Sequence, residues 1–307
     1  MARTVRLPRS GGSFLEIFCA GRGGLGHPTR FTPSQVAQIA RTVLRTPEVM
    51  VKVTGGGASS GAVAAHVSYI GRQGQVELET DEGERVIGRA AQREILKSWQ
   101  LDLCAGQYRR QRNGYAPKRS TRLVYNIVLS MPWPTAPEKV LVAARAFARE
   151  KFALRHRYAL VLHTDQKHPH VHLVVKAEPS RGRRLRIDKA TLRIWREDFA
   201  KNMREQGVEA NATPSVYRRK KNVKASGAFL FRGEPAAARL KEAQGAIVEQ
   251  WMSVAAVLER QGEISLAEDV RHFVTDLYRE RPNSPRVPNL RRSGTSHEDR
   301  TAGERFR

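Results

Sequence analysis

The sequence has few cysteines, few acidic residues and no long apolar run, and each shortage excludes a class of protein. Its two cysteines, Cys19 and Cys104, cannot build a disulfide framework or a cysteine-rich metal cluster. No stretch reaches the roughly 18 consecutive apolar residues of a membrane helix, and the N-terminus lacks the apolar segment of a signal peptide. We therefore expect no membrane insertion and a reducing, cytoplasmic location.

Positive charge is what the chain has in excess. Its 307 residues carry 54 Lys and Arg against 30 Asp and Glu, a net charge of +24. Apolar residues make up 40%, enough to form a core, so general disorder is excluded. A compact body with this charge repels itself unless a polyanion neutralises it, and nucleic acid is the default candidate. Charge indicates a partner but not a reaction.

Segments of strand and helix pattern alternate through the middle of the chain. Strand patterns lie at 49–54, 122–131, 158–163 and 171–176, and helical patterns at 33–44, 61–72, 91–104, 138–152 and 189–206. The last two strands are separated by a connection of hairpin length, which requires antiparallel pairing. The fold class predicted is α/β, with an at least partly antiparallel sheet flanked by helices.

Composition divides the chain into four parts. We expect a basic N-terminal extension (1–48), an α/β domain (49–215), a helical basic region (216–281) and a disordered tail (282–307) rich in Arg, Pro, Ser and Asn. The helices after residue 235 are too short for a helicase or primase and have no phosphate-binding glycine loop, so their role stays open.

Histidines gather in the segment HTDQKHPHVHLVV. Side chains alternate along a strand, so His170 and His172 share a face, and His163 lies beside them if the two strands pair. Three neutral imidazoles on one face suit a divalent metal with open positions for substrate oxygens. Asp165 is placed to accept an imidazole N–H. Pro169 breaks the strand next to His168, so His168 is either a further ligand or a loop residue near the site. A buried, hydrogen-bonded histidine without metal is the alternative for any one of them.

A nucleic-acid-binding protein with such a metal can polarise a scissile phosphate for attack by water or by a side-chain hydroxyl. Tyr69 is the candidate hydroxyl, on a short Ala-rich helix behind a glycine-rich turn. His66 lies three residues earlier on nearly the same helix face and could orient the phenol. The alternative is an ordinary core tyrosine, because Val63, Val67 and Ile70 line the same helix.

Three segments, in order, resemble the motifs of MOB-P class conjugative and mobilization relaxases, which are HUH endonucleases. HTDQKHPHVHLVV resembles the third motif, with the histidine pair at His170 and His172. VYNIVLSMPWP is similar to the second motif, a strand that ends in a serine, here Ser130. AAHVSYIGRQG resembles the first motif, which carries the nicking tyrosine, here Tyr69, before an arginine, here Arg72.

The resemblance implies a largely antiparallel sheet of about five strands. It further implies that Tyr69 nicks single-stranded or supercoiled origin-of-transfer DNA and forms a covalent 5′-phosphotyrosyl intermediate. Mg²⁺ or Mn²⁺ would be held by the three histidines, and Ser130 would contact the DNA. Relaxosome accessory proteins and a type IV coupling protein are the implied partners, and the chain could enter a recipient cell with its DNA. The candidate phosphate contacts are Arg72, Arg181, Arg183 and Arg184.

Two positions depart from the family pattern. Close relatives often have an acidic residue where this chain has Lys167, and an asparagine where it has Lys176. Both departures bear on the group that takes the tyrosine proton, so the general base stays open between Asp165, His168 and the metal.

Two other functions remain possible from sequence. One is a metal-dependent nuclease that uses water, with Tyr69 structural. The other is a non-catalytic DNA-binding accessory protein whose histidines hold a structural metal. A replication initiator or transposase is disfavoured because in those HUH proteins the tyrosine follows the histidines, whereas here it precedes them.

Overall fold

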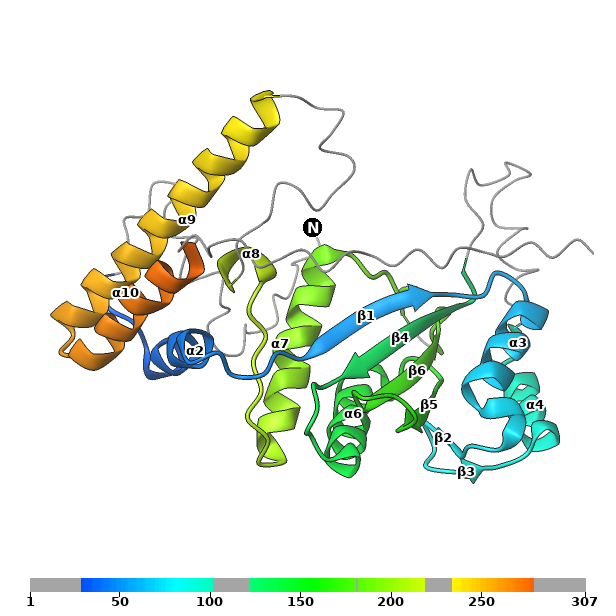
Figure 1. The fold of residues 1–307 in the computed structure, drawn as a ribbon. Coiled ribbons are helices and arrows are strands. Elements are labelled where there is room, and N and C mark those ends of the chain that lie inside the picture. Colours follow the sequence, from blue (N-terminus) through cyan, green and yellow to red (C-terminus); the bar gives the residue numbers. More distant parts are fainter. Residues whose placement is uncertain (1–28, 102–121, 181, 219–233, 279–307) are drawn as a thin grey trace, which may run out of the picture.

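A single antiparallel sheet of six strands organises the protein (Figure 1). This computed structural model describes residues 29–101, 122–180, 182–218 and 234–278. The strand order is β1-β4-β6-β5-β2-β3, and every neighbouring pair is antiparallel. The strands are β1 (Met50–Gly55), β2 (Leu78–Thr80), β3 (Arg85–Val86), β4 (Val124–Ser130), β5 (Tyr158–His163) and β6 (His170–Lys176).

Helices lie on both faces of the sheet and form a separate bundle beside it (Figure 1). They are α2 (Pro33–Val43), α3 (Ser60–Ile70), α4 (Arg89–Ser98), α6 (Pro137–Phe152), α7 (Lys189–Glu205), α8 (Ser215–Arg218), α9 (Glu234–Arg260) and α10 (Ile264–Tyr278), with a 3₁₀ turn, η2, at Arg72–Gly74. Among the described residues, no helix has both the length and the apolarity to cross a bilayer.

The predicted α/β class and antiparallel sheet are confirmed. The four strand patterns of the sequence form four adjacent strands of the sheet, and the β2–β3 hairpin adds two short strands at the β5 edge, which makes six rather than the five that the resemblance implies. The side chains of Thr32 and Ser59 cap two helix starts by accepting from Gln35 N–H and Ala62 N–H, respectively.

Side-chain alternation gives the two sheet faces different partners. Along β6, Val171, Leu173 and Val175 pack against α6 and α7, in a cluster that includes Phe147 and Phe199. Val174 points to the opposite face, where it packs with the buried side of α3 and with Trp99. Because the period of a strand is two, residues 170 and 172 of β6 share the α3 face with residue 174.

The bundle is formed by α2, α9 and α10 around Trp251 and Phe273. It lies on the opposite side of the sheet from α3 and α4 (Figure 1). Helix α2 therefore belongs to the same core as the two helices after residue 234, although it falls within the segment expected to be an extension. The four-part division of the chain stays a prediction, and its tail, 282–307, lies outside the described residues.

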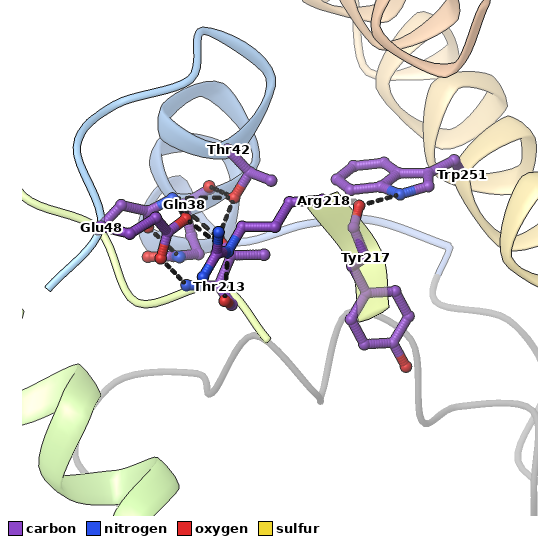
Figure 2. Close-up of polar contacts among 8 residues, drawn as sticks. Gln38, Thr42, Glu48, Thr213, Tyr217, Arg218 and Trp251 are labelled. Carbon is purple, nitrogen blue, oxygen red and sulfur yellow. Dashed lines mark hydrogen bonds and ion pairs between the residues drawn. The ribbon is translucent and has the colours of Figure 1, made fainter. Parts of the chain in front are cut away.

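A buried amide connects the bundle to the α/β domain. Asn211 is fully buried, and its Nδ2 lies within hydrogen-bond distance of three acceptors, Thr42 Oγ1 (3.2 Å), Glu48 Oε1 (3.2 Å) and Thr213 Oγ1 (2.8 Å). Gln38 Nε2 donates to Asn211 Oδ1 at 2.7 Å. Figure 2 labels Gln38, Thr42, Glu48 and Thr213 beside a second link, in which Trp251 Nε1 of α9 donates to the Tyr217 carbonyl at 3.1 Å.

We expect Asn211→Ala to lower the free energy of unfolding by about 2–3 kcal/mol, because it leaves several buried polar atoms without their partner. Urea denaturation measures the change. Lys97→Ala is the control, since it removes only an exposed ion pair with Glu94 and should cost less than about 0.5 kcal/mol. Equal effects of the two substitutions would contradict the role given to Asn211.

Candidate active site

The two central hairpin strands bring the three predicted histidines together. His163 ends β5 and is paired in register with His170, the first residue of β6. The ring centroids are 5.2 Å apart for His163 and His170, 4.6 Å for His163 and His172, and 5.1 Å for His170 and His172. One nitrogen from each ring lies within 4.8 Å of the other two. The backbone pairing of the sheet thus preorganises a three-imidazole cluster.

Hydrogen bonds determine which nitrogens offer lone pairs. A carbonyl oxygen only accepts, so His163 Nε2 donates to Ile70 O (2.6 Å) and its Nδ1 carries the lone pair. His170 Nδ1 donates to His168 O (3.1 Å), which leaves its Nε2 to bind a cation.

Burial favours the neutral form of two of the three histidines, His163 and His172. Burial, followed by the neighbouring histidines and Arg72, lowers the pKa of His172 to about 3. Burial also lowers the pKa of His163. Neutral imidazoles are the form that binds divalent metals, and the three side chains therefore fit such an ion.

Tyr69 lies in the same pocket as the histidines. It occupies the last turn of α3, where Val63, Val67 and Ile70 are buried and anchor the helix to the sheet. Its own side chain is 64% exposed, which excludes the alternative of a core tyrosine. The pocket has a volume of about 290 Å³ and is lined by Met50, Tyr69, Arg72, Val128, Ser130, His163, Gln166, His168, His170 and His172.

The turn after α3 directs Arg72 into this pocket. Gly71 packs so closely on Gln92 that an added Cβ would come within 2.5 Å of its side chain, and Arg72 then adopts a left-handed φ of 48°. The Arg72 guanidinium lies 5.6 Å from the centre of the Tyr69 ring, and its Nη2 is 3.3 Å from His163 Nδ1. One cation therefore faces both the tyrosine and the cluster.

The expectation that Asp165 accepts an imidazole N–H is wrong. The Asp165 carboxylate accepts from Arg72 Nη2 rather than from an imidazole. The Arg72 hydrogen bond, the largest contribution, lowers the pKa of Asp165. The left-handed turn at Arg72 brings its guanidinium to the Asp165 carboxylate. Asp165 thus holds Arg72 in place.

Ser130 and His168 are both engaged with the loops that border the pocket. Ser130 is only 4% exposed, and its Oγ donates to the Pro169 carbonyl at 3.0 Å. The Nδ1 of His168 accepts from the Trp133 amide at 3.0 Å, so in the neutral ring the proton resides on Nε2. His168 is therefore arranged as a donor toward the pocket.

His66 neighbours both the tyrosine and the cluster. Its ring centroid is 6.5 Å from that of Tyr69 and 6.5 Å from that of His172. Burial lowers its pKa, and its Nε2 is buried with no hydrogen-bond partner among the described residues. The supporting role of His66 stays a prediction.

The arginines near residue 183 are not brought to the pocket. Arg184 binds Glu178 and the Arg122 carbonyl, and neither Arg183 nor Arg184 lines the pocket. Arg181 lies outside the described residues. Sequence reasoning missed Met50 and Gln166, which do line it; strand alternation could have identified Met50, since its neighbour Val51 faces the core.

The family comparison bears on this site. Residues 79–208 match the model of the relaxase family, MobA/VirD2-like, nuclease domain. This match supports a relaxase class assignment. The matched range includes the three histidines and Ser130, whereas Tyr69 and Arg72 precede it.

Individual relatives agree with the assignment. The chain is similar to T-DNA border endonuclease VirD2 of Rhizobium radiobacter, at 25% identity over 185 residues, 56% of this chain and 43% of that protein. VirD2 of Agrobacterium fabrum (strain C58) is 26% identical over 137 residues, 42% of this chain and 30% of that protein. The chain thus spans less than half the length of these two relatives.

One solved structure also resembles the chain weakly. It belongs to a study titled "Molecular Basis of Vancomycin Resistance Transfer in Staphylococcus aureus". The likeness covers 55% of this chain and 99% of that one, at 14% identity and a TM-score of 0.36. A likeness this low supports no conclusion about the site.

We expect Mn²⁺ to raise the thermal unfolding midpoint of the wild-type protein and to lose this effect in His172→Ala. A ligand that binds only the folded state at a hundredfold excess over its Kd stabilises by about 2.7 kcal/mol. Differential scanning fluorimetry with an Mn²⁺ titration measures the shift. His272→Ala, an exposed histidine of α10, is the matched control and should keep the wild-type response. An unchanged Mn²⁺ response in His172→Ala would exclude the cluster as the metal site.

Proposed function

We propose that this protein nicks one strand of origin-of-transfer DNA through covalent attack by Tyr69. The observation that supports the proposal is the exposed Tyr69 ring in the same pocket as the three-histidine cluster. A hydroxyl beside a cation site is the arrangement needed to displace a sugar oxygen from a phosphate. The match of residues 79–208 to the relaxase family model, and similarity to proteins named as T-DNA border endonucleases, agree with this chemistry.

The proposed step is a transesterification. Tyr69 Oη loses its proton and bonds to phosphorus, while the bond from phosphorus to the 3′ oxygen breaks and that oxygen takes up a proton. One phosphodiester replaces another, so the reverse reaction can rejoin the strand without another energy source. His163, His170 and His172 would hold the divalent metal, Mg²⁺ or Mn²⁺ in our proposal, which when bound withdraws charge from the phosphate oxygens.

The chain's own side chains prepare this step. The Arg72 guanidinium is placed beside the Tyr69 ring to attract the phosphate, and Asp165 orients it through their ion pair. His168, with its proton on Nε2, can donate to a phosphate oxygen. Because Tyr69 is 64% exposed, its proton has a direct route to water. We therefore assign Asp165 and His168 to positioning and hydrogen bonding rather than to the role of general base.

The DNA substrate is single-stranded or supercoiled origin DNA in this proposal. The net charge of +24 favours a polyanion of this kind. We further propose relaxosome accessory proteins and a type IV coupling protein as partners, with nicking in the cytoplasm and transfer of the chain along with the DNA.

We expect Tyr69→Phe to abolish protein-linked DNA and to slow nicking by roughly a thousandfold or more, because the nucleophile is lost. A supercoiled plasmid with the cognate origin, incubated with Mn²⁺ and stopped with SDS, shows both the nicked circle and the covalent adduct on a gel. Tyr125→Phe is the control, since that residue packs on the opposite, α6–α7 face of the sheet. Nicking at the wild-type rate by Tyr69→Phe, without adduct, would instead identify a nuclease that uses water.

A further inference from the structure

Trp133 is exposed, unlike the other tryptophans. Trp99, Trp195 and Trp251 are 0%, 6% and 0% exposed and belong to the cores, whereas Trp133 is 64% exposed. It lies in the loop between β4, which ends at Ser130, and α6. A single exposed apolar side chain is ordinary on a protein surface, so the surroundings of Trp133 decide whether it marks a binding site.

The Trp133 ring lines a pocket of about 460 Å³, together with Pro134, Pro137, Thr164, Lys167 and Pro169. Gln166 lines both this pocket and the one that contains Tyr69. The Trp133 amide donates to Nδ1 of His168, whose side chain lines the Tyr69 pocket. The aromatic pocket is therefore the immediate neighbour of the candidate active site.

The loop that carries Trp133 is held by hydrogen bonds. The Pro132 carbonyl accepts from Thr135 twice, from its N–H at 3.2 Å and from its Oγ1 at 2.8 Å. The Pro169 carbonyl accepts from Ser130 Oγ at 3.0 Å and from the Met131 N–H at 3.4 Å, which joins this loop to the one before β6. The ring is thus presented on a preorganised support.

A positive charge accompanies the ring. The Lys167 Nζ lies 6.0 Å from the centre of the Trp133 ring. An aromatic platform beside a cation is the combination that binds single-stranded nucleic acid, because a base stacks on the ring while the cation attracts the backbone.

We infer that this pocket holds a base of the DNA strand next to the scissile phosphate, stacked on Trp133 with its backbone near Lys167. The inference rests on the proposed function, since it takes the strand in the Tyr69 pocket to continue into the neighbouring one. It adds a stacking contact that fixes the position of the strand relative to Tyr69.

The test compares DNA with and without bases. The full-length wild-type chain binds a fluorescein-labelled oligo-dT of roughly 20 nucleotides, or an abasic deoxyribose phosphate strand of equal length and charge, and anisotropy gives both Kd values. We expect Trp133→Ala to weaken oligo-dT binding roughly 5- to 150-fold and to leave abasic binding unchanged. Trp133→Phe should retain most of the affinity. Leu154→Ala, 96% exposed at the start of the connection to β5, is the control and should bind like wild type.

Intrinsic fluorescence gives a second readout. Because the other three tryptophans are buried, oligo-dT should quench wild-type emission and leave that of Trp133→Phe nearly unchanged, although this variant still binds.

Equal loss of oligo-dT and abasic binding in Trp133→Ala, or no loss of either, would overturn the inference. If wild-type protein forms the covalent adduct but shows no preference for bases, the inference fails and the proposed function stands. Base-dependent binding through Trp133 without any covalent adduct on cognate origin DNA would support the stacking contact and contradict the proposed function.

Discussion

The in-register pairing of β5 with β6 is the constraint on which the site depends. It sets His163 opposite His170, and the period of two in β6 then places His172 on the same face. A slip of one residue would move both β6 histidines into the Phe147 side of the sheet, where Val171 and Leu173 now pack. The hydrophobic pattern of β6 therefore keeps His170 and His172 on the α3 face, because burial of the alternate apolar side chains fixes the register of the strand.

A single hydrogen bond ties the tyrosine helix to this cluster. His163 Nε2 donates to the carbonyl of Ile70, the last residue of α3, so the helix end and the end of β5 are held together. The bond also selects the tautomer of His163 and thus the nitrogen that offers a lone pair. Tyr69, one residue before Ile70, is left exposed over the pocket. Core packing of α3 and one imidazole contact jointly position the proposed nucleophile.

Much of the architecture could be predicted from short-range patterns. The alternation that puts His170 and His172 on one face of a strand reflects residues close in sequence, and it appears as expected. The β2–β3 hairpin was harder to predict. Its segment is short and acidic, and β2 joins the sheet at the edge that β5 offers.

The sequence by itself predicted a polyanionic partner and determined the α/β antiparallel fold and the residues of the histidine cluster, because charge, periodicity and alternation are local properties. Only the tertiary structure decided how the loops meet. Asp165 pairs with Arg72 rather than with an imidazole, and His168 accepts from Trp133, across long gaps in sequence. Such contacts depend on where the sheet and α3 place the ends of distant loops, and no local pattern encodes that distance.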